Sequence, residues 1–495
     1  QAADQLLQTA TQKGTQFEYQ DQDVINTTFR GGKIKELPGI YNYTATDDKF
    51  HTVKDPVIIH YNGDVKPWST ERRCPNTMAS RYFAYLRLTP YRKFRSKFVR
   101  SRIVRTLKKA AGIDVYPSRV KVALIVDEYF GACGTAYGGY GFLARNYIAR
   151  YLPDTNISVE VLLSNKHRWK FAPNALTEKV DNRKVIVPPG RFFARQWLKK
   201  KKYDIYLTVE LTHNILKYER RSKPIIHWIQ DPRPWSEWLE IQTVKLFPEN
   251  SYWSSSLYDS VNKLYGKGLV TFVSQGYFLN DKAIELYRLP GDAPIAYMPN
   301  PIDIDYGFDP ESYPKKNHIL FIGRIESIKR GWLFCEIAKQ LPQYEFFMLG
   351  QTFREKSQNE SIMAGYRDIP NLHFVGHVEG EEKMKYIREA KILVNTSIHE
   401  ALPITFLEAL AYGTLLVSCR NPEDLTSKFG RYTGPVLGDG FDKVPLFTSA
   451  IEELIENEGL RKELSCKAVE YIREIHPVHK FQQHMRKLIH DLAHK

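Results

Sequence analysis

The stretch Arg-Val-Lys-Val-Ala-Leu-Ile-Val, residues 119–126, indicates the fold class of this chain. A nearly continuous aliphatic run of this length is typical of a strand buried on both faces of a parallel sheet. A glycine-rich loop at 131–141 follows, then a helical pattern at 142–152 and a second strand pattern at 158–163. This order of strand, helix and strand predicts an α/β fold with a doubly wound sheet.

The same pattern continues to residue 298, is interrupted by turn-forming and polar residues at 300–317, and begins again at 318. The interruption predicts a linker between two domains. Further strands are expected at 204–209, 224–229, 269–273, 296–298, 318–322, 344–349, 372–375, 392–395 and 415–418. Helices are expected at 332–340, 381–390 and 401–412, with a mainly helical remainder. We therefore expect two Rossmann-like doubly wound domains that face each other across a cleft.

Composition excludes several classes of protein. At 495 residues the chain is too long for one ordinary domain, and 43% hydrophobic with 26% charged residues is a globular composition. Its five scattered cysteines form no Cys-x-x-Cys pair, which favours a reducing, cytosolic setting over a disulfide or zinc framework. Neither GxGxxG nor GxxxxGK[ST] occurs, which disfavours dinucleotide oxidoreductases and P-loop kinases. The polar start without Met leads us to expect a longer natural chain.

The net charge of +15 is concentrated in one segment. Residues 66–121 contain 16 Lys and Arg against two acids, and aromatic residues recur among the basic ones at helical spacing. Such a basic amphipathic segment suits the anionic surface of a membrane. Nucleic acid is a weaker alternative because no recognised nucleic-acid module accompanies the segment, and a solvated basic linker is another reading.

Two carboxylates in the second domain are the strongest candidates for a functional site. Glu400 and Glu408 stand eight residues apart around an expected helix start, directly after the strand at 392–394. A helix amino terminus at a strand end favours an anionic ligand such as a diphosphate. Glu408 could then accept hydrogen bonds from ribose hydroxyls, while Glu400 would meet a sugar at the mouth. Solvated glutamates on an amphipathic helix are the alternative.

A basic group is expected at the same edge of the sheet. Arg324 ends the first strand of this domain, and Lys329 and Arg330 open the next helix. These cations can neutralise the phosphates of a departing nucleoside diphosphate, so a metal is unnecessary there. The DxD-like sequence at 303–305 lies in the interdomain turn and is expected to be structural.

These motifs together resemble a known family. The ordered set of Gly323-Arg324, Lys329-Arg330-Gly331, the Pro-Asn-Pro-Ile-Asp stretch at 299–303 and Glu400-x7-Glu408 is similar to the retaining family 4 (group 1) glycosyltransferases with the GT-B fold, over about 120–495. The resemblance implies transfer of a sugar from a nucleotide donor with net retention. The second domain would mainly hold the donor and the first the acceptor, with no cofactor required.

The resemblance assigns roles to residues of the second domain. Arg324, Lys329 and Arg330 would hold the diphosphate, Glu400 the donor sugar and Glu408 the ribose. The family often has Gly-Phe-Gly after the first glutamate, whereas this chain has Ala-Leu-Pro at 401–403. Since proline has no N–H, the backbone contacts to phosphate are assigned to Ile404 and Thr405.

Further assignments concern the first domain and the linker. Gly139, in the glycine-rich loop, and Asn300 are expected to bind the donor. Many relatives have a histidine near the sugar, where this chain reads His227-Trp228-Ile229-Gln230-Asp231. We expect Asp231 or Gln230 to line the cleft and His227 to be a strand histidine, with His213 as a second candidate.

Residues 1–72 resemble a different family. The stretch His60-x-x-Gly-x-x-Lys66-Pro-Trp, with the preceding motifs around Asp21 and Gln22, is similar to the carboxy-terminal portion of family 8 glycosyltransferases of GT-A fold. The resemblance implies that His60 is a ligand of Mn²⁺ or Mg²⁺ and that Lys66 contacts the diphosphate. Asp21 and Gln22 would line the acceptor side. Only an intact family 8 domain is expected to hold the metal, so we expect this remnant to be inactive in this chain.

The expected function is that of a retaining glycosyltransferase in surface polysaccharide synthesis, as one half of a bifunctional protein in the cytoplasm, at the inner face of a membrane. Its partners would be a nucleoside diphosphate sugar, a saccharide or lipid-linked saccharide acceptor and an anionic membrane, without nucleic acid. The alternatives are a membrane-binding scaffold with a non-catalytic GT-B fold, a phosphorylase or an epimerase. The expected segments are a family 8 remnant (1–72), a basic helical linker (73–117), an acceptor domain (118–307), a nucleotide-sugar domain (308–470) and a terminal helix returning to the acceptor domain (471–495).

Overall fold

The computed structural model divides the chain into two compact units, residues 1–118 and 119–495. It describes residues 43–44, 59–60, 79–89 and 119–493, the last range with gaps at 165–167, 211–213, 252 and 353–355. In the first unit, β1 (Tyr43–Thr44) pairs in parallel with β2 (Ile59–His60), and α3 spans Ala79–Leu86. No described helix is long and apolar enough to cross a membrane.

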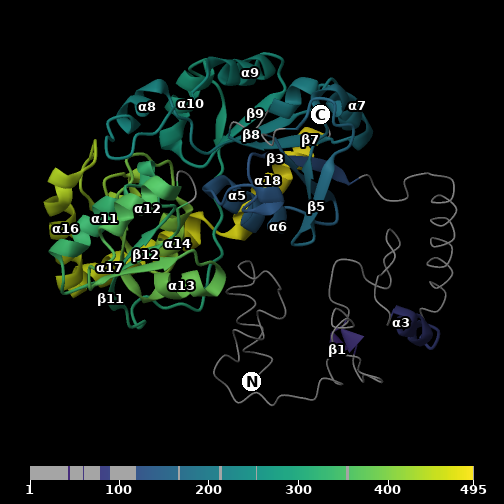
Figure 1. Ribbon diagram of the computed structural model, residues 1–495. Helices are drawn as coiled ribbons and strands as arrows, with labels where there is room; N and C mark the ends of the chain where they lie inside the picture. Colours follow the sequence, from purple (N-terminus) through teal and green to yellow (C-terminus); the bar gives the residue numbers. More distant parts are fainter. Residues whose placement is uncertain are drawn as a thin grey trace. The chain divides into compact units, whose positions relative to one another are not determined.

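The second unit contains two separate sheets, each covered by helices (Figure 1). The first sheet has eight strands in the order β10-β9-β8-β7-β3-β4-β6-β5, and all neighbours are parallel except β5 and β6. Its strands are β3 (Val120–Val126), β4 (Ile157–Leu163), β5 (Leu176–Val180), β6 (Arg183–Val187), β7 (Ile205–Val209), β8 (Ile225–Ile229), β9 (Val270–Ser274) and β10 (Ile295–Tyr297).

The second sheet has six parallel strands in the order β13-β12-β11-β14-β15-β16. Its strands are β11 (Lys316–Ile322), β12 (Glu345–Leu349), β13 (Leu372–Gly376), β14 (Ala390–Asn395), β15 (Leu415–Ser418) and β16 (Gly430–Tyr432). The strand order reverses beside β3 in the first sheet and beside β11 in the second. Ligands of doubly wound sheets bind at such reversals, outside the carboxyl ends of the strands.

The helices follow the strands in the manner expected of crossover connections. Those of the first sheet are α5 (Gly139–Leu143), α6 (Ala149–Tyr151), α7 (Arg191–Lys201), α8 (Trp235–Ile241), α9 (Ser255–Tyr265) and α10 (Asn280–Tyr287). Those of the later chain are α11 (Gly331–Gln340), α12 (Lys356–Ala364), α13 (Gly380–Glu389), α14 (Ile404–Ala411), α15 (Leu425–Lys428), α16 (Val444–Glu456), α17 (Glu458–Ile475) and α18 (Val478–Ala493). The two doubly wound sheets expected from the sequence are confirmed.

Three local expectations were incomplete. The hairpin of β5 and β6 was not predicted, because β5 is polar and largely exposed; its turn residues Asp181 and Asn182 have φ angles of 47° and 61°, as a tight hairpin turn requires. The short edge strand β16 was also missed. The helix expected at 142–152 is interrupted by a π-helical turn at Ala144–Ile148 between α5 and α6.

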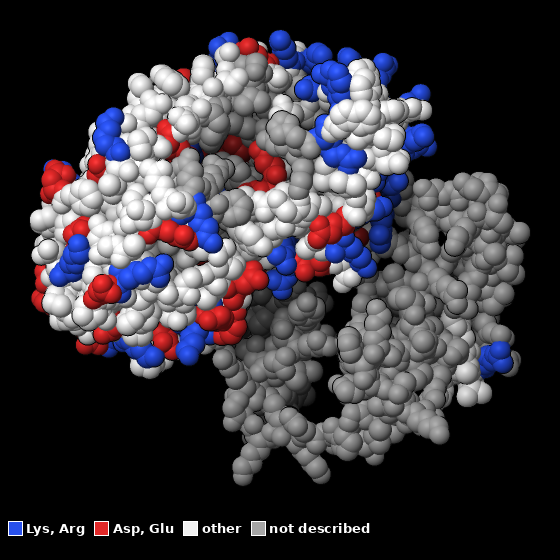
Figure 2. All heavy atoms as spheres, in the orientation of Figure 1, with Lys and Arg blue, Asp and Glu red and all other residues white. Residues whose placement is uncertain are grey.

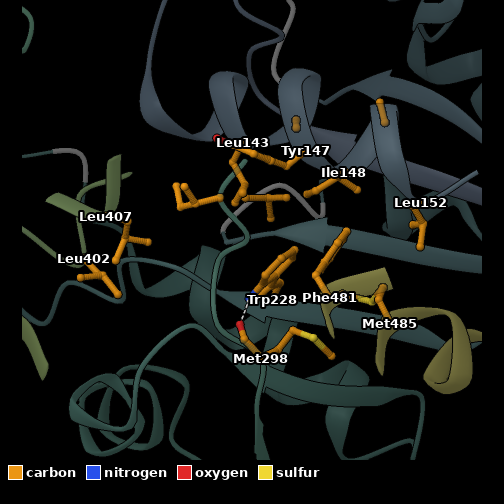
Figure 3. Packing of buried hydrophobic residues seen from close by; sticks show 14 of the residues in the cluster. Leu143, Tyr147, Ile148, Leu152, Trp228, Met298, Leu402, Leu407, Phe481 and Met485 are labelled. Atoms are coloured by element: carbon orange, nitrogen blue, oxygen red, sulfur yellow. Dashed lines mark hydrogen bonds between the residues drawn. The ribbon is translucent and has the colours of Figure 1, made fainter. Parts of the chain in front are cut away.

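The last helix packs against the first sheet rather than the second (Figure 3). Phe481 of α18 stacks on Trp228 of β8 with ring centroids 5.5 Å apart, and the Trp228 indole donates a hydrogen bond to the Met298 carbonyl at 3.0 Å. The chain therefore crosses between the sheets twice. The crossings bond to each other: Ile302 N–H donates to the His476 carbonyl at 2.8 Å, and the His476 ring lies 2.7 Å from the Asn300 carbonyl.

Candidate functional site

A cleft of about 860 Å³ lies between the carboxyl edges of the two sheets. Its first wall comes from the loops after β3, β7 and β8, and its second wall from the loops after β11 and β14 and the start of α14. Nine of the site residues predicted within 119–495 line this cleft: Arg324, Lys329, Glu400, Glu408, Asp231, Gly139, Ile404, Thr405 and Asn300. The topology thus brings residues almost 270 positions apart into one site.

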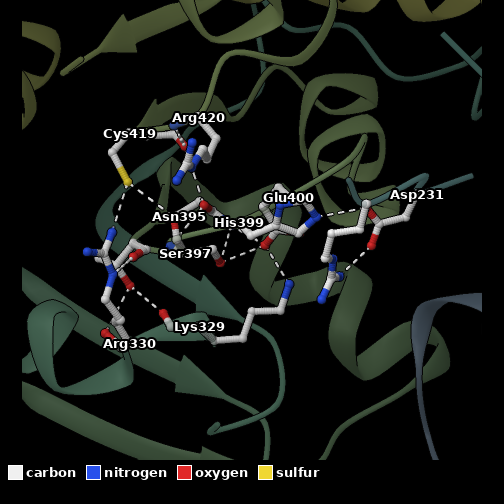
Figure 4. Close-up of polar contacts among 12 residues, drawn as sticks. Asp231, Lys329, Arg330, Asn395, Ser397, His399, Glu400, Cys419 and Arg420 are labelled. Atoms are coloured by element: carbon white, nitrogen blue, oxygen red, sulfur yellow. Dashed lines mark hydrogen bonds and ion pairs between the residues drawn. The ribbon is translucent and has the colours of Figure 1, made fainter. Parts of the chain in front are cut away.

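Glu400 lies at the centre of a polar network on the second wall (Figure 4). Its Oε1 atom accepts hydrogen bonds from Lys329 Nζ at 2.5 Å, Ser397 Oγ at 2.6 Å and Asn395 Nδ2 at 3.0 Å. Burial raises the pKa of Glu400, but the charge of Lys329 and these hydrogen bonds outweigh burial and bring the pKa below its ordinary value. Glu400 is therefore an ionised carboxylate whose partner, Lys329, also faces the cleft.

Glu408, in α14, is a buried carboxylate of which only one oxygen is hydrogen-bonded within the part of the chain that the structure describes. Its Oε1 atom accepts a hydrogen bond from Lys383 Nζ at 2.6 Å, and the two side chains are 5% and 11% exposed. Its Oε2 atom is buried and has no hydrogen-bond partner among the described residues. Because a buried carboxylate oxygen without a donor is costly, this atom is suited to a hydroxyl group brought by a ligand.

The start of α14 adds free backbone donors. Pro403 precedes the helix and its carbonyl accepts from the Phe406 N–H at 3.0 Å, so the N–H groups of Ile404 and Thr405 lie before the first helical hydrogen bond. The Arg324 side chain, 31% exposed and 3.3 Å from a Glu326 carboxylate oxygen, lines the same part of the cleft. Cationic side chains and a helix amino terminus together form an anion-binding corner.

The prediction that Arg330 contacts the diphosphate is corrected by its position. Its guanidinium is fully buried and donates hydrogen bonds to the carbonyls of Thr396 at 2.7 Å, Val436 at 3.0 Å and Gly438 at 2.9 Å, away from the cleft lining. The backbone of Arg330 has a φ of 46°, at the junction between a 3₁₀ turn and α11. Of the adjacent cations only Lys329 reaches the cleft, and Arg330 binds the surrounding loops together.

Two adjacent glycines on the first wall, Gly138 and Gly139, have different surroundings. A Cβ atom on Gly138 would lie 1.9 Å from a Glu128 carboxylate oxygen, so that position tolerates no side chain without rearrangement. A Cβ on Gly139 would meet no atom within 4 Å. Gly138 thus serves the packing of Glu128, while Gly139 leaves open space where a ligand can approach the backbone.

An ion-pair network that the sequence did not predict joins the two walls. His399 lies 2.7 Å from Asp231 Oδ1 through Nε2 and 3.3 Å from Glu237 Oε2 through Nδ1. Asp231 also binds Arg233 at 2.6 Å, and Glu237 binds Lys282. Burial would raise the pKa of Asp231, but Arg233 and His399 hold it well below its ordinary range. Although Asp231, Glu237 and His399 converge closely enough for a metal ion, both carboxylates are already neutralised by side-chain cations.

Buried amides form the floor of the cleft. Asn300 exchanges hydrogen bonds of 3.0 Å with the side chain of Gln230 and donates to Gln275 at 2.6 Å. Gln230 lines the cleft together with Asp231, as expected for this pair. His227, the expected strand histidine, is buried in β8 with Nδ1 3.1 Å from the Thr208 hydroxyl, and it does not line the cleft.

Glu210 is a second residue that the sequence did not indicate. It lies at the end of β7 with a φ of 51°, and its carboxylate accepts the N–H groups of Gln230 at 2.6 Å and Asp231 at 2.8 Å and the hydroxyl of Tyr287. Burial raises its pKa to about 7. Its spacing from Asp231 carries no motif, so only the fold brings it to the cleft.

Some predicted positions lie outside the described residues or outside the cleft. Asp21, Gln22, Lys66 and His213 are not among the described residues, and His60 is described only as part of β2. Asp303, in the DxD-like sequence, accepts hydrogen bonds from Tyr151 at 2.5 Å and Arg150 at 3.4 Å, in keeping with a structural role.

Comparisons with known proteins match two families along the chain. Residues 305–470 match the family described as "Glycosyl transferases group 1", and residues 2–72 match "Glycosyl transferase family 8". No curated protein matches the chain.

Solved glycosyltransferases share the fold at low identity. Sucrose-phosphate synthase from Thermosynechococcus elongatus is 15% identical, with a TM-score of 0.57 over 76% of this chain and 99% of its own. A glycosyltransferase from Rickettsia africae is 14% identical, with a TM-score of 0.53 over 76% and 99%. Anabaena HepE in complex with UDP-glucose is 10% identical, with a TM-score of 0.53 over 75% and 99%. Residues 305–470 therefore match the group 1 glycosyl transferases, and the unit that contains them has the GT-B glycosyltransferase fold.

Proposed function

We propose that the chain is a retaining glycosyltransferase that moves a sugar from a nucleoside diphosphate sugar to a saccharide or lipid-linked saccharide acceptor. The observation that carries this proposal is the pairing, in one cleft, of an anion-binding corner with the unpartnered oxygen of Glu408. A nucleoside diphosphate presents the complementary groups, namely charged phosphates beside ribose hydroxyls. The similarity in fold to HepE, whose structure contains UDP-glucose, supports a donor of this class.

Each residue then has a role that follows from its surroundings. Arg324, Lys329 and the N–H groups of Ile404 and Thr405 would hold the diphosphate, and Glu408 Oε2 would accept a ribose hydroxyl. When phosphate binds Lys329, its bond to Glu400 weakens, which frees Glu400 to accept hydroxyl groups of the donor sugar. The ion pair at 2.5 Å is thus proposed to hold both groups in place before the donor arrives.

Retention is proposed to follow from attack on the face that the diphosphate leaves. The acceptor oxygen forms the new bond to the anomeric carbon while the bond to the phosphate oxygen breaks, and that oxygen takes the acceptor proton. Arg324 and Lys329 stabilise the charge that develops on the leaving group. Neither a protein nucleophile nor a cofactor is required by this course.

A panel of UDP-, GDP- and dTDP-sugars with candidate acceptors tests the proposal. We expect one donor class to give a glycosylated product whose anomeric configuration, read by NMR, equals that of the donor. Arg324→Ala should cut turnover by about 100-fold or more, whereas Arg288→Ala, on an exposed ion pair that does not line the cleft, should not. An inverted product would contradict retention. Reaction without an acceptor would favour an epimerase, and dependence on inorganic phosphate a phosphorylase.

The two family matches in one chain support a bifunctional protein, with a second transfer activity in a family 8 domain and a role in polysaccharide synthesis. A divalent metal is proposed only for an intact domain of that kind. Transfer by the GT-B half should continue in EDTA, because its leaving group meets side-chain cations. Complete loss of that transfer in EDTA would contradict this division.

A further inference from the structure

An exposed cluster of aromatic residues lies on the first domain away from the cleft. Trp169 is 69% exposed, Phe171 41%, Phe192 58% and Phe193 37%. We name these four residues, with Lys170 and Arg191, the aromatic-basic patch. Contiguous exposed aromatic surface is uncommon on a soluble protein and marks a place of contact. None of its residues lines the cleft, so the sugar-transfer site does not account for it.

The loop 168–172 packs on the start of α7, and this contact fixes the positions of the patch residues. The Phe171 and Phe192 rings stack with centroids 4.6 Å apart, and Trp169 meets Phe171 edge-on at 5.3 Å. The Gly190 N–H donates to the Ala172 carbonyl at 2.9 Å. A Cβ atom on Gly190 would lie 2.4 Å from the Trp169 carbonyl, so glycine is what allows the loop to sit on the helix start. The aromatic residues are therefore held in place before any partner binds.

The surroundings of the patch are strongly basic. Neither α7, with the sequence RFFARQWLKKK, nor the loop 168–172 contains an acidic residue. Lys201 forms an ion pair with Glu160 at 2.7 Å. Five other basic residues of this surface have no carboxylate within ion-pair distance in the described parts of the chain: Lys170, Arg191, Arg195, Lys199 and Lys200. Figure 2 shows Lys and Arg side chains gathered over the region where Figure 1 places α7. The partner of this surface is thus expected to be negatively charged.

The stacking of the rings distinguishes between anionic partners. Single-stranded nucleic acid binds by placing bases on open aromatic faces. Here Phe171 and Phe192 cover each other, and the Lys170 ammonium and Arg191 guanidinium lie 5.1 Å and 5.4 Å from the centroids of these rings. Insertion into a bilayer needs only apolar edges flanked by cations that meet lipid headgroups. The observations favour a lipid surface.

We propose that the aromatic-basic patch docks the first domain onto an anionic lipid surface, with its aromatic side chains in the headgroup region and the basic residues of α7 on the phosphates. The residues of this surface are not those of the basic segment at 73–117. It does not depend on the proposed sugar transfer, since it can bind whether or not the cleft is active.

The test is sedimentation of the full chain with vesicles of phosphatidylcholine, with and without phosphatidylglycerol. Trp169→Ser with Phe192→Ser should lower partitioning onto the phosphatidylglycerol vesicles by about tenfold or more. Lys199→Glu with Lys200→Glu should lower it by a similar factor that shrinks as salt is added. Leu446→Ser, 46% exposed on α16, and Lys462→Glu with Lys467→Glu, exposed on α17, are the matched controls and should bind normally.

Hydrogen exchange separates this surface from other lipid-binding parts of the chain. Vesicles should protect peptides that cover 168–172 and 191–201, and thermal unfolding should show that the variants keep their fold. Wild-type binding by both the Trp169/Phe192 and the Lys199/Lys200 double variants, or protection confined to residues before 119, would overturn the proposal. So would loss of binding to a single-stranded oligonucleotide with unchanged binding to the vesicles, because the patch would then serve nucleic acid.

Discussion

Replacing Glu408 by glutamine should weaken donor binding at least as much as it weakens the fold. The Glu408 side chain is 5% exposed, and Lys383 Nζ lies 2.6 Å from its Oε1. Removing one member of a buried ion pair costs about 3 to 5 kcal/mol. Glutamine keeps an oxygen that can accept from Lys383, so we expect a loss of about 1 to 3 kcal/mol in the free energy of unfolding.

The loss in donor binding should be of similar size or slightly larger. If the glutamine oxygen faces Lys383, its NH₂ group replaces Oε2, and a donor then faces the ribose hydroxyl where an acceptor stood. Losing a hydrogen bond to a charged group costs about 1.5 to 3 kcal/mol, which is about 10- to 150-fold in affinity. Calorimetric titration with the nucleoside diphosphate measures this loss, and urea unfolding measures stability. Glu382→Gln, on an exposed acid of the neighbouring α13, is the control.

A double variant distinguishes a ligand contact from a merely structural pair. Lys383→Met alone leaves Glu408 buried without its cation and should be strongly destabilising. Glu408→Leu with Lys383→Met replaces both members by apolar groups of similar size, so stability should largely recover. Donor affinity should remain low, because no acceptor faces the ribose. Recovery of donor affinity in the double variant would refute the assignment of Glu408.

Three further outcomes are expected. Arg330→Met should lower the free energy of unfolding by about 3 kcal/mol or more, because it leaves three buried carbonyls without a donor, while turnover per folded molecule stays near normal; a turnover loss equal to that of Lys329→Met would contradict this. Burial lowers the pKa of His476 from 6.5 to about 4. As pH falls through this range, the unfolded chain binds a proton that the folded protein does not, so the free energy of unfolding drops by about 3 kcal/mol. Urea unfolding at several pH values should show a flatter pH dependence of stability for His476→Gln, and an unchanged slope would count against burial as the cause. His399→Leu removes the link to Asp231 and should lower kcat/KM about tenfold with the fold retained, measured by steady-state kinetics; unchanged kinetics would show that the link is dispensable.

Much of the fold was accessible from the sequence because buried parallel strands have an unmistakable composition. The run at 119–126 became β3, and the polar interruption near 300–317 separates the two sheets. The hairpin of β5 and β6 escaped prediction, since an edge strand exposed to solvent has no hydrophobic signature.

The site was predictable where a motif combines local structure with chemistry. Glu400 and Glu408 surround a helix start, and that local arrangement is enough to place both at the strand edge. Glu210 and the link from His399 to Asp231 carry no such signal, because their partners are 20 or more positions away in the chain.

By itself, the sequence determined two doubly wound domains, a basic segment and a set of carboxylates and cations at strand ends, since these depend on composition and short-range spacing. Only the tertiary structure decided which of two adjacent cations serves the cleft. Lys329 meets Glu400, whereas Arg330 is surrounded by carbonyls of loops up to 108 residues away. A side chain takes the partners that the fold brings within reach, and adjacent residues at a helix start point in different directions.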